Sequence, residues 1–177
     1  MNEYKTVATT QGYHFYWSGP FSQWQACQIS LWGVQFNTAE QAMMYGKAQV
    51  FDDAVTGAEI LAASDPGKQK ALGRKVAGFT EEKWDEVKCD LVREINFAKF
   101  DQNKGLRRKL FQTAPKLLVE ASPIDTIWAI GLDAETASIT PEEDWPGQNL
   151  LGRILTDVRE ALTARYPEEA KACRAGV

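Results

Sequence analysis

The sequence predicts a mainly helical α+β domain with a small antiparallel sheet, and three observations lead to this prediction. Short segments rich in aromatic and β-branched residues, each ended by turn residues, fill the first third of the chain. From residue 38 onward, apolar residues recur every three or four positions, which is the period of a helix. The length of 177 residues suits one domain. We therefore expect a single domain over residues 1–177, with its core over about residues 15–162 and a frayed tail over residues 167–177.

Strands are expected early in the chain and once again after residue 115. The segment Tyr13–Trp17 is rich in strand formers and is ended by a Ser-Gly-Pro turn. His14 is the only histidine of the chain, and we interpret it as a strand residue of this segment. Two apolar stretches on either side of Gly33 predict a hairpin with the glycine in its turn. The predicted strands are Tyr13–Trp17, Cys27–Trp32, Val34–Phe36 and Leu117–Glu120.

Helices are expected where capping residues precede an apolar repeat. Thr38 is a predicted N-cap, and Gln41 three residues later completes the pattern of a capping box. Asp65 and Pro66 read as the N-cap and first residue of another helix. The predicted helices cover about residues 38–52, 56–63, 65–76, 80–102 and 149–164. Residues 132–147, which include two prolines, are expected to be a loop.

Composition excludes several classes of function. The chain has three widely spaced cysteines and one histidine, so neither a disulfide framework nor a metal site is predicted. Its formal net charge of −4 argues against a long groove for a nucleic-acid strand, but it permits recognition of one nucleotide. The longest apolar runs fall short of the roughly 20 residues that span a bilayer. Because the N-terminus lacks an apolar signal region, we expect a cytoplasmic protein, or a nuclear one in a eukaryote.

The first predicted helix carries two charged residues on its apolar face. Glu40 and Lys47 are seven residues apart, which places them two turns apart on one side of a helix. The other members of this apolar stripe are Met43, Met44, Val50 and Phe51, whereas the opposite, polar face holds Gln41, Tyr45, Gln49 and Asp52. Burying a charge is costly without a partner, so the helix either borders a polar cleft or provides buried partners. The alternative without a functional role is that Glu40 supports the helix N-terminus while Lys47 extends outward to solvent.

A series of short segments resembles the YbiA-like NADAR superfamily from about Phe15 to Leu162. The segments that carry this resemblance are Ser22-Gln23-Trp24, Ala39-Glu40-Gln41-Ala42-Met43-Met44, Lys47-Ala48, Phe51-Asp52-Asp53, Lys70-Ala71-Leu72-Gly73-Arg74-Lys75-Val76, Trp84, Lys99-Phe100-Asp101-Gln102-Asn103, Leu106, Val119-Glu120-Ala121-Ser122-Pro123, Asp125, Trp128-Ala129-Ile130-Gly131 and Gly147-Gln148-Asn149-Leu150-Leu151-Gly152. Each segment alone is weak, whereas their order and spacing are specific. The family's Trp-Gly-Ile-Gly is Trp128-Ala129-Ile130-Gly131 here, and an alanine fits only where the backbone does not need a positive φ. Gln41 replaces the histidine of the bacterial branch, and this form resembles the branch of fungi, other eukaryotes and phages.

The resemblance implies a hydrolase that cleaves the bond between a ribose anomeric carbon and a nitrogen. The expected substrate is ADP-ribosylated guanine in a nucleotide or nucleic acid, from which ADP-ribose would be removed. One alternative keeps the reaction but takes phosphoribosylamino pyrimidines, early intermediates of riboflavin synthesis. Another is a binding module for ADP-ribose or NAD without catalysis. Water is the expected second substrate, and no cofactor or metal is implied.

The same resemblance assigns roles to individual residues. Glu40 and Asp125 would stabilise the positive charge that develops on the sugar, although Asp125 also fits a turn cap. Lys47 would donate a proton or bind a phosphate, or as a neutral amine attack the opened sugar. The catalytic candidates are therefore Glu40, Lys47 and Asp125, and their presence favours an enzyme over a binding module.

Substrate binding is assigned to polar, aromatic and small residues of the matched segments. These candidates are Ser22, Gln23, Trp24, Met44, Arg74, Trp128, Gly131 and Asn149. Trp24 and Trp128 are expected either to stack on a base or to lie in the core. Arg74 fits a phosphate contact or a solvated surface. Asn149 is expected at a helix start, where exposed N–H groups bind phosphate or where it serves only as an N-cap.

Overall fold

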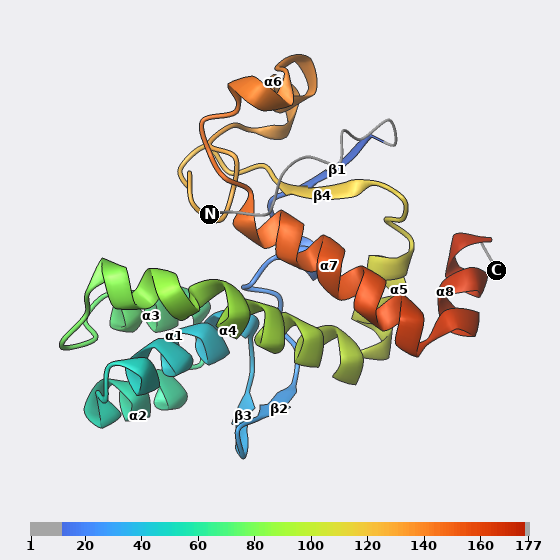
Figure 1. Ribbon diagram of the computed structural model, residues 1–177. Coiled ribbons are helices and arrows are strands. Elements are labelled where there is room, and N and C mark those ends of the chain that lie inside the picture. The colour runs from blue at the N-terminus through green and yellow to red at the C-terminus, as the bar shows by residue number, and fades with distance from the viewer. Residues whose placement is uncertain (1–11, 176–177) are drawn as a thin grey trace. The chain divides into compact units, whose positions relative to one another are not determined.

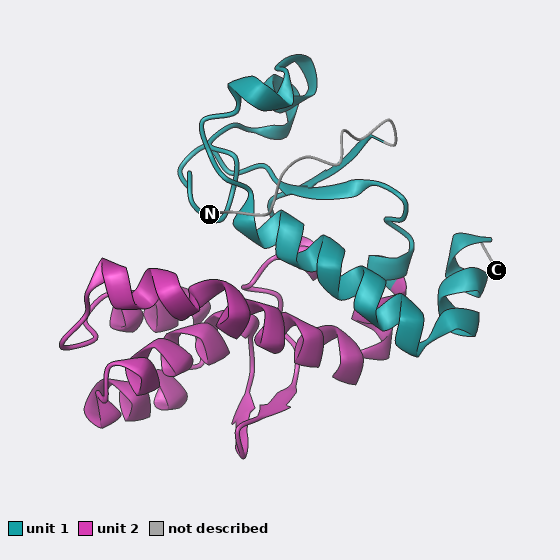
Figure 2. Ribbon diagram, viewed as in Figure 1, with its two compact units in different colours: residues 1–17, 109–177 teal, residues 18–108 magenta. Residues whose placement is uncertain are grey.

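The computed structural model describes residues 12–175, which form two compact units (Figure 2). One unit joins the N-terminal segment up to Trp17 to the chain from Lys109 onward, and the other spans Ser18–Arg108. The structure defines the geometry within each unit. The described residues contain eight α-helices and two pairs of short strands (Figure 1). The predicted mainly helical α+β class with a small antiparallel sheet is thereby confirmed, while the single domain stays a prediction.

The antiparallel sheet is a hairpin in the unit Ser18–Arg108. Strand β2 (Ile29–Leu31) pairs with β3 (Val34–Phe36), with Ile29 opposite Phe36. The two turn residues Trp32 and Gly33 both have positive φ, 53° and 73°. This is the backbone of a tight two-residue hairpin turn, so the predicted hairpin around Gly33 is confirmed.

Four helices pack together in the same unit. Their bounds are α1 (Ala39–Val50), α2 (Ala54–Ala62), α3 (Pro66–Gly73) and α4 (Glu81–Gln102), and a short 3-10 turn, η1 (Gly19–Phe21), precedes the hairpin. Helix α1 contacts α2, α3 and α4, and Figure 1 shows the four helices grouped together. The side chains of Thr38, Asp65 and Thr80 accept hydrogen bonds from the third helical residue, as their predicted N-cap roles require. Each such cap contributes about 1 kcal/mol to helix stability.

Gln41 differs from the prediction that followed from the helical period, which placed it on the polar face of α1. Its side chain is buried, and its Nε2 donates to the carbonyl oxygens of Ile60, Leu61 and Ala63 at 3.1–3.2 Å. Its Oε1 accepts from the N–H of Asn37, one residue before the N-cap, at 2.8 Å. The buried amide thus adds a donor to carbonyl groups at the C-terminal end of α2, where the regular hydrogen bonds of a helix run out.

The other unit is built on two parallel strands. Strand β1 (Tyr13–Tyr16) pairs with β4 (Leu117–Glu120), with Tyr13 opposite Leu117 and Tyr16 opposite Glu120. Helix α7 (Leu150–Arg165) packs on β4 (Figure 1) and buries an apolar stripe. That stripe contains Leu151, Ile154, Leu155, Val158 and Leu162. His14 lies in β1, as predicted.

Three further helices were not predicted. The segment expected to be a loop contains α6 (Ala134–Ile139) and a 3-10 turn, η2 (Glu142–Asp144), and the segment expected to be a frayed tail contains α8 (Pro167–Arg174). Helix α8 begins with a proline, has two glutamates in its first turn, and buries Ala170 and Cys173. Helix α5 (Lys104–Phe111) follows α4 directly. These helices have only six to eight residues and need packing to be stable, so periodicity detects them poorly.

No helix within residues 12–175 has the length and apolar character needed to cross a bilayer. Over the same residues, no three side chains of His, Cys, Asp or Glu gather where they would hold a metal ion.

Candidate active site

The eleven predicted site residues are divided between the two units. Seven belong to the unit Ser18–Arg108, namely Ser22, Gln23, Trp24, Glu40, Met44, Lys47 and Arg74. Four belong to the other unit, namely Asp125, Trp128, Gly131 and Asn149. Each group has its own geometry.

Glu40 and the turn Ser22–Trp24 are directly connected. Glu40 is the second residue of α1 and only 5% exposed, and its N–H donates to the carbonyl oxygen of Gln23 at 3.0 Å. Within the turn, the N–H of Trp24 donates to Oγ of Ser22 at 3.2 Å. The Trp24 side chain is 48% exposed, so its indole is available for stacking. The turn therefore places a solvent-accessible aromatic ring next to the helix start that carries a buried carboxylate.

Lys47 is held by groups of its own unit. Its Nζ donates to the carbonyl oxygen of Gly73 at 2.9 Å and lies 3.9 Å from the ring centre of Phe79. The ring of Trp84 is further away, at 5.8 Å, and is buried. Partial burial removes water from the ammonium and lowers the pKa of Lys47 below its ordinary value. Lys47 is thus a partly desolvated cation with a fixed position.

Met44 and Arg74 have contrasting environments at the end of α3. Met44 is buried and packs on Gly73, where the Cβ of any other residue would overlap the methionine side chain. This packing gives Met44 a role in the core. Arg74 follows Gly73 at the C-terminal end of the helix and is exposed, which leaves its guanidinium accessible to an anion.

Asp125 orders the loop that carries Trp128. Its Oδ1 accepts from the N–H groups of Ile127 and Trp128 at 2.9 and 2.8 Å. The turn-capping role is therefore real, and it uses one oxygen of the carboxylate. Among residues 12–175, Oδ2 of Asp125 has no hydrogen-bond partner. Trp128 is half-buried, and its carbonyl oxygen accepts from the N–H of Leu151 in α7 at 3.1 Å.

The Trp-Ala-Ile-Gly segment tolerates its alanine. Ala129 is fully buried and lies outside the positive-φ region, so the backbone does not need a glycine there. Gly131 does have a positive φ of 74°, and a Cβ at this position would lie 2.8 Å from Cγ of Pro146. The glycine that the backbone requires is therefore Gly131.

Asn149 joins the start of α7 to β4. It is 1% exposed and has left-handed backbone angles, φ 53° and ψ 38°. Its Oδ1 accepts from the N–H of Glu120 and its Nδ2 donates to the carbonyl oxygen of Leu118, both at 3.0 Å. The side chain makes no capping bond to α7, so the predicted N-cap position is correct while the amide serves the strand.

Sequence reasoning missed Lys99 as a candidate. This lysine of α4 is 0% exposed, and its Nζ donates to the carbonyl oxygen of Ser22 at 2.8 Å. It lies four residues after the buried Ile95, on the apolar stripe of the helix. A charge on an apolar stripe is the same anomaly that identified Glu40 and Lys47, and it would have identified Lys99 as well.

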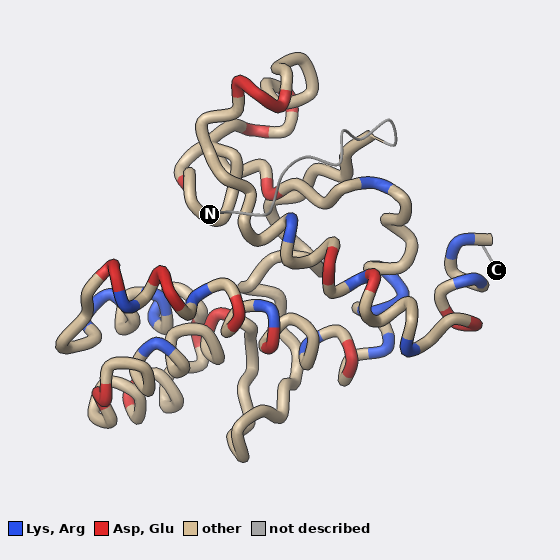
Figure 3. The backbone as a smooth tube through the Cα atoms, viewed as in Figure 1, with Lys and Arg blue, Asp and Glu red and all other residues tan. Residues whose placement is uncertain are grey.

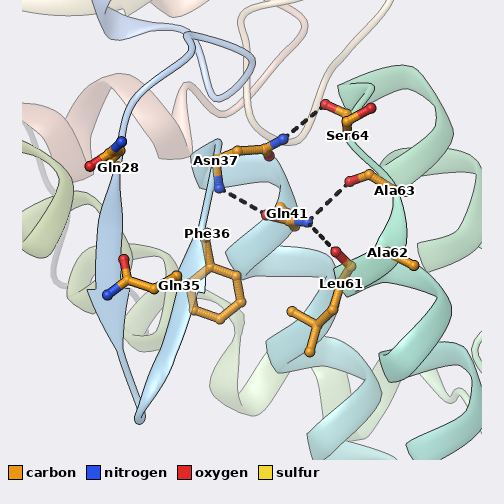
Figure 4. Close-up of a pocket in the computed structure, with 9 residues that line it drawn as sticks. All are labelled: Gln28, Gln35, Phe36, Asn37, Gln41, Leu61, Ala62, Ala63 and Ser64. Atoms are coloured by element: carbon orange, nitrogen blue, oxygen red, sulfur yellow. Dashed lines mark hydrogen bonds between the residues drawn. The ribbon is translucent and has the colours of Figure 1, made fainter.

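A polar pocket lies beside α1, apart from the predicted site residues (Figure 4). Its volume is about 510 Å³, and it is lined by Gln28, Gln35, Phe36, Asn37, Gln41, Leu61, Ala62, Ala63 and Ser64. Figure 4 shows the amide of Gln41 between the hairpin side of the pocket and the end of α2. None of the eleven predicted residues lines this pocket.

Comparison with known proteins identifies the family. A family model described as the NADAR domain matches residues 13–163. The chain is 45% identical over 145 residues to N-glycosidase R617 of Acanthamoeba polyphaga mimivirus, which covers 79% of this chain and 85% of that protein. It is 33% identical over 144 residues to N-glycosidase YbiA of Escherichia coli K12, covering 81% of both chains.

A solved structure and a third relative agree with this assignment. The NMR structure of E. coli YbiA matches with a TM-score of 0.72 and 29% identity, covering 89% of this chain and 88% of that one. The riboflavin biosynthesis protein VVA0006 of Vibrio vulnificus is 30% identical over 149 residues, which are 84% of this chain but 37% of that protein. The family model matches most of this chain, and the fold of this chain is similar to that of YbiA. This chain therefore belongs to the NADAR family.

Proposed function

We propose that this protein removes ADP-ribose from ADP-ribosylated guanine by hydrolysing the bond between the ribose anomeric carbon and the base nitrogen. The names of the relatives support N-glycosidase activity, which is hydrolase chemistry. The viral relative, at 45% identity, is named for the N-glycosidase reaction alone, so the choice of guanine rests on the resemblance of the sequence motifs. Gln41, which is characteristic of the eukaryotic and phage form of the motif, agrees with this choice.

The observation that carries the proposal is the buried Glu40, whose N–H is hydrogen-bonded to the turn that carries the exposed Trp24. Cleavage of a ribosyl C–N bond places positive charge on the sugar. A carboxylate that is already shielded from water stabilises such charge more strongly than one in solvent. The indole of Trp24 offers a face on which a purine can stack next to this carboxylate.

The remaining candidates take roles that their surroundings permit. The unshared oxygen of Asp125 can contact the sugar or orient the attacking water. Lys47 either remains charged and holds a phosphate or donates a proton, or loses its proton and attacks the opened sugar. In the second route the ribose ring opens, the amine nitrogen bonds to the anomeric carbon, and the bond from that carbon to the base nitrogen breaks, so that the base leaves with a proton and an imine remains. Hydrolysis of that imine then returns the amine and the free sugar.

A second candidate substrate is a phosphoribosylamino pyrimidine of the riboflavin pathway. The similarity to VVA0006, whose name refers to riboflavin biosynthesis, favours it. A binding module without catalysis is the third possibility, and it would not require the carboxylates to be kept.

The decisive experiment incubates the pure protein separately with an ADP-ribosylated guanine oligonucleotide and with a phosphoribosylamino pyrimidine. Mass spectrometry then follows the released sugar. We expect free ADP-ribose from the first substrate. In Glu40→Gln, kcat should fall by about 100-fold while the calorimetric affinity for ADP-ribose is retained, because the lost charge acts mainly in the transition state.

Other results would change the assignment. Release of ribose phosphate from the pyrimidine alone would replace the guanine substrate. Binding of ADP-ribose without release from either substrate would leave a binding module. An unchanged kcat in Glu40→Gln would remove Glu40 from the catalytic group.

A further inference from the structure

Two side chains at the C-terminal end of α4 hold the backbone of residues 22–30 at its two ends. Gln102 accepts from the N–H of Ser30 at 2.8 Å and donates to the carbonyl oxygen of the same residue at 2.9 Å. Lys99 reaches the other end, where its Nζ donates to the carbonyl oxygen of Ser22 at 2.8 Å. Gln102 therefore holds the hairpin, whereas Lys99 holds the turn that carries Trp24.

The burial of Lys99 is costly, which sets it apart from Gln102. Its side chain is 0% exposed, and its Nζ lies 5.0 Å from the ring centre of Phe100. Taking an ammonium out of water costs several kcal/mol, and a methionine would fill similar space without that cost. The Ser22 carbonyl oxygen also accepts from the N–H of Gln25 at 3.2 Å, so folding alone does not require the lysine to satisfy it.

A short chain of bonds links Lys99 to the catalytic candidate on α1. The ammonium holds the carbonyl oxygen of Ser22, and the carbonyl oxygen of the next residue, Gln23, accepts from the N–H of Glu40 at 3.0 Å. The two acceptors therefore belong to consecutive peptide groups, which are joined at the Cα of Gln23. A change in the direction of the Ser22 carbonyl would tilt this peptide and shift the first turn of α1 relative to Trp24.

We propose that Lys99 is a positioning residue that sets the geometry between Trp24 and Glu40. It contacts no substrate and acts through the Ser22–Gln23 peptide. A displacement of about 1 Å between a stacking platform and a reacting group costs up to about 100-fold in rate, so even a small tilt would be measurable. The proposal rests on the proposed N-glycosidase function, in which these two side chains act on one substrate.

The test compares Lys99→Met with the matched control Gln102→Ala, which loses backbone bonds to the same segment at the hairpin end. Amide hydrogen exchange is measured by NMR without substrate, and kcat and KM are measured on the ADP-ribosylated guanine oligonucleotide. In Lys99→Met we expect the Glu40 amide to exchange at least about tenfold faster, while amides of Ile154–Val158 in α7 are unchanged. We expect kcat to fall at least about tenfold, with KM within about threefold. Gln102→Ala should leave both the Glu40 amide and kcat near the wild-type values.

Several outcomes would overturn the positioning role. These are an unchanged Glu40 amide in Lys99→Met, equal acceleration of all amides, or the same kcat loss in Gln102→Ala. If Lys99→Met does not fold, Lys99→Gln removes the charge with a polar side chain and is measured in the same way, with the same criteria. Since the exchange experiment needs no turnover, it still tests the positioning if neither proposed substrate is cleaved.

Discussion

Three predicted site side chains use backbone groups as partners, which ties their chemistry to the local fold. Lys47 donates to the carbonyl oxygen of Gly73, Asp125 accepts from two amides of its own loop, and Asn149 bridges two peptide groups of β4. Side chains held in this way are positioned before a substrate arrives, as electrostatic catalysis requires. Substitutions at these positions therefore change folding and activity together, and pairs of variants are needed to separate the two effects.

Asp125 allows such a separation. Asp125→Asn keeps an oxygen that can accept from Ile127 and Trp128, so we expect an unfolding free energy close to that of the wild type. Asp125→Ala loses both bonds and should be less stable by about 1 to 2 kcal/mol. If the carboxylate acts on the substrate, kcat should fall by about 100-fold in both variants, because both lack the charge. Urea unfolding and steady-state kinetics give the two readings, and a fully active Asp125→Asn would reduce Asp125 to a turn cap.

Lys47 gives a prediction about pH. Burial lowers the pKa of its ammonium, so the folded protein releases this proton more readily than the unfolded chain. Between the lowered pKa and the ordinary value of about 10.4, the unfolded chain binds more protons, and stability should rise with pH across this window. A carbon-13 NMR titration should give Lys47 a midpoint below that ordinary value, and Lys47→Met should lose this contribution to the pH dependence of unfolding. A midpoint at or above the ordinary lysine value would contradict the desolvated environment.

At the scale of elements, the packing of α7 on β4 depends on a close approach at Gly152. A Cβ at this position would overlap the carbonyl oxygen of Leu118 and the side chain of Asn149. Because one of these atoms belongs to the backbone of a strand, rotamer changes cannot relieve the overlap.

Gly152→Ala should therefore destabilise the protein by about 3 kcal/mol, at the upper end for overpacking. The matched control is Gly105→Ala in α5, where a Cβ would meet no atom within 4 Å. That variant should be neutral or more stable by up to about 1 kcal/mol, because alanine favours the helix. Chemical denaturation of both variants checks the difference, and a similar effect of the two substitutions would argue against the close packing.

Sequence patterns over a few neighbouring residues predicted those helices and strands whose stabilising contacts lie within the same few residues. The N-caps Thr38, Asp65 and Thr80 are confirmed, because a capping bond involves residues only three positions apart. The pairing of β1 with β4 joins segments about 100 residues apart, and both read as strands whatever their partner, so neither the pairing nor its parallel direction was predictable. Gln41 was assigned to the wrong face because the carbonyl groups that attract it belong to another helix.

Some features of the candidate site could likewise be predicted from neighbouring residues, whereas others depend on segments far away in the sequence. The charges of Glu40 and Lys47 on an apolar stripe were visible in the helical period, and the structure gives the Lys47 ammonium a partner in the carbonyl oxygen of Gly73. The role of Asn149 as a bridge to β4 depends on a strand 30 residues earlier and left no trace in the local pattern. The roles of the three catalytic and eight substrate-binding candidates stay a prediction.

At the scale of the whole molecule, charge is dispersed. The chain has 20 Lys and Arg residues against 24 Asp and Glu residues, which gives the net charge of −4. Figure 3 shows basic and acidic positions interspersed along the described part of both units. Such a distribution offers few sites for a row of phosphates, whereas one exposed arginine such as Arg74 suffices for a single nucleotide.

Binding of an ADP-ribosylated oligonucleotide should accordingly depend weakly on salt. Each phosphate contact on a single strand contributes roughly −0.7 to the slope of log affinity against log salt, and we expect the value for one or two contacts. Titrations at several salt concentrations measure this slope, with ADP-ribose alone as the reference ligand. A slope of several units would reveal an extended basic groove.

The hydrogen bonds that Asn149 makes to β4 also affect whether two molecules of this protein can associate through the edge of that strand. On the side of β4 that faces away from β1, Asn149 satisfies the N–H of Glu120 and the carbonyl oxygen of Leu118, and Oγ1 of Thr156 accepts from the N–H of Leu118 at 3.2 Å. The carbonyl oxygen of Glu120 receives the N–H of Ile130 at 3.0 Å. Exposed strand edges invite edge-to-edge aggregation, and here side chains and a loop close that edge where a third strand would otherwise add. The β4 edge of this two-stranded sheet therefore has no free backbone groups at Leu118 and Glu120 with which to recruit an extended segment from a neighbouring molecule.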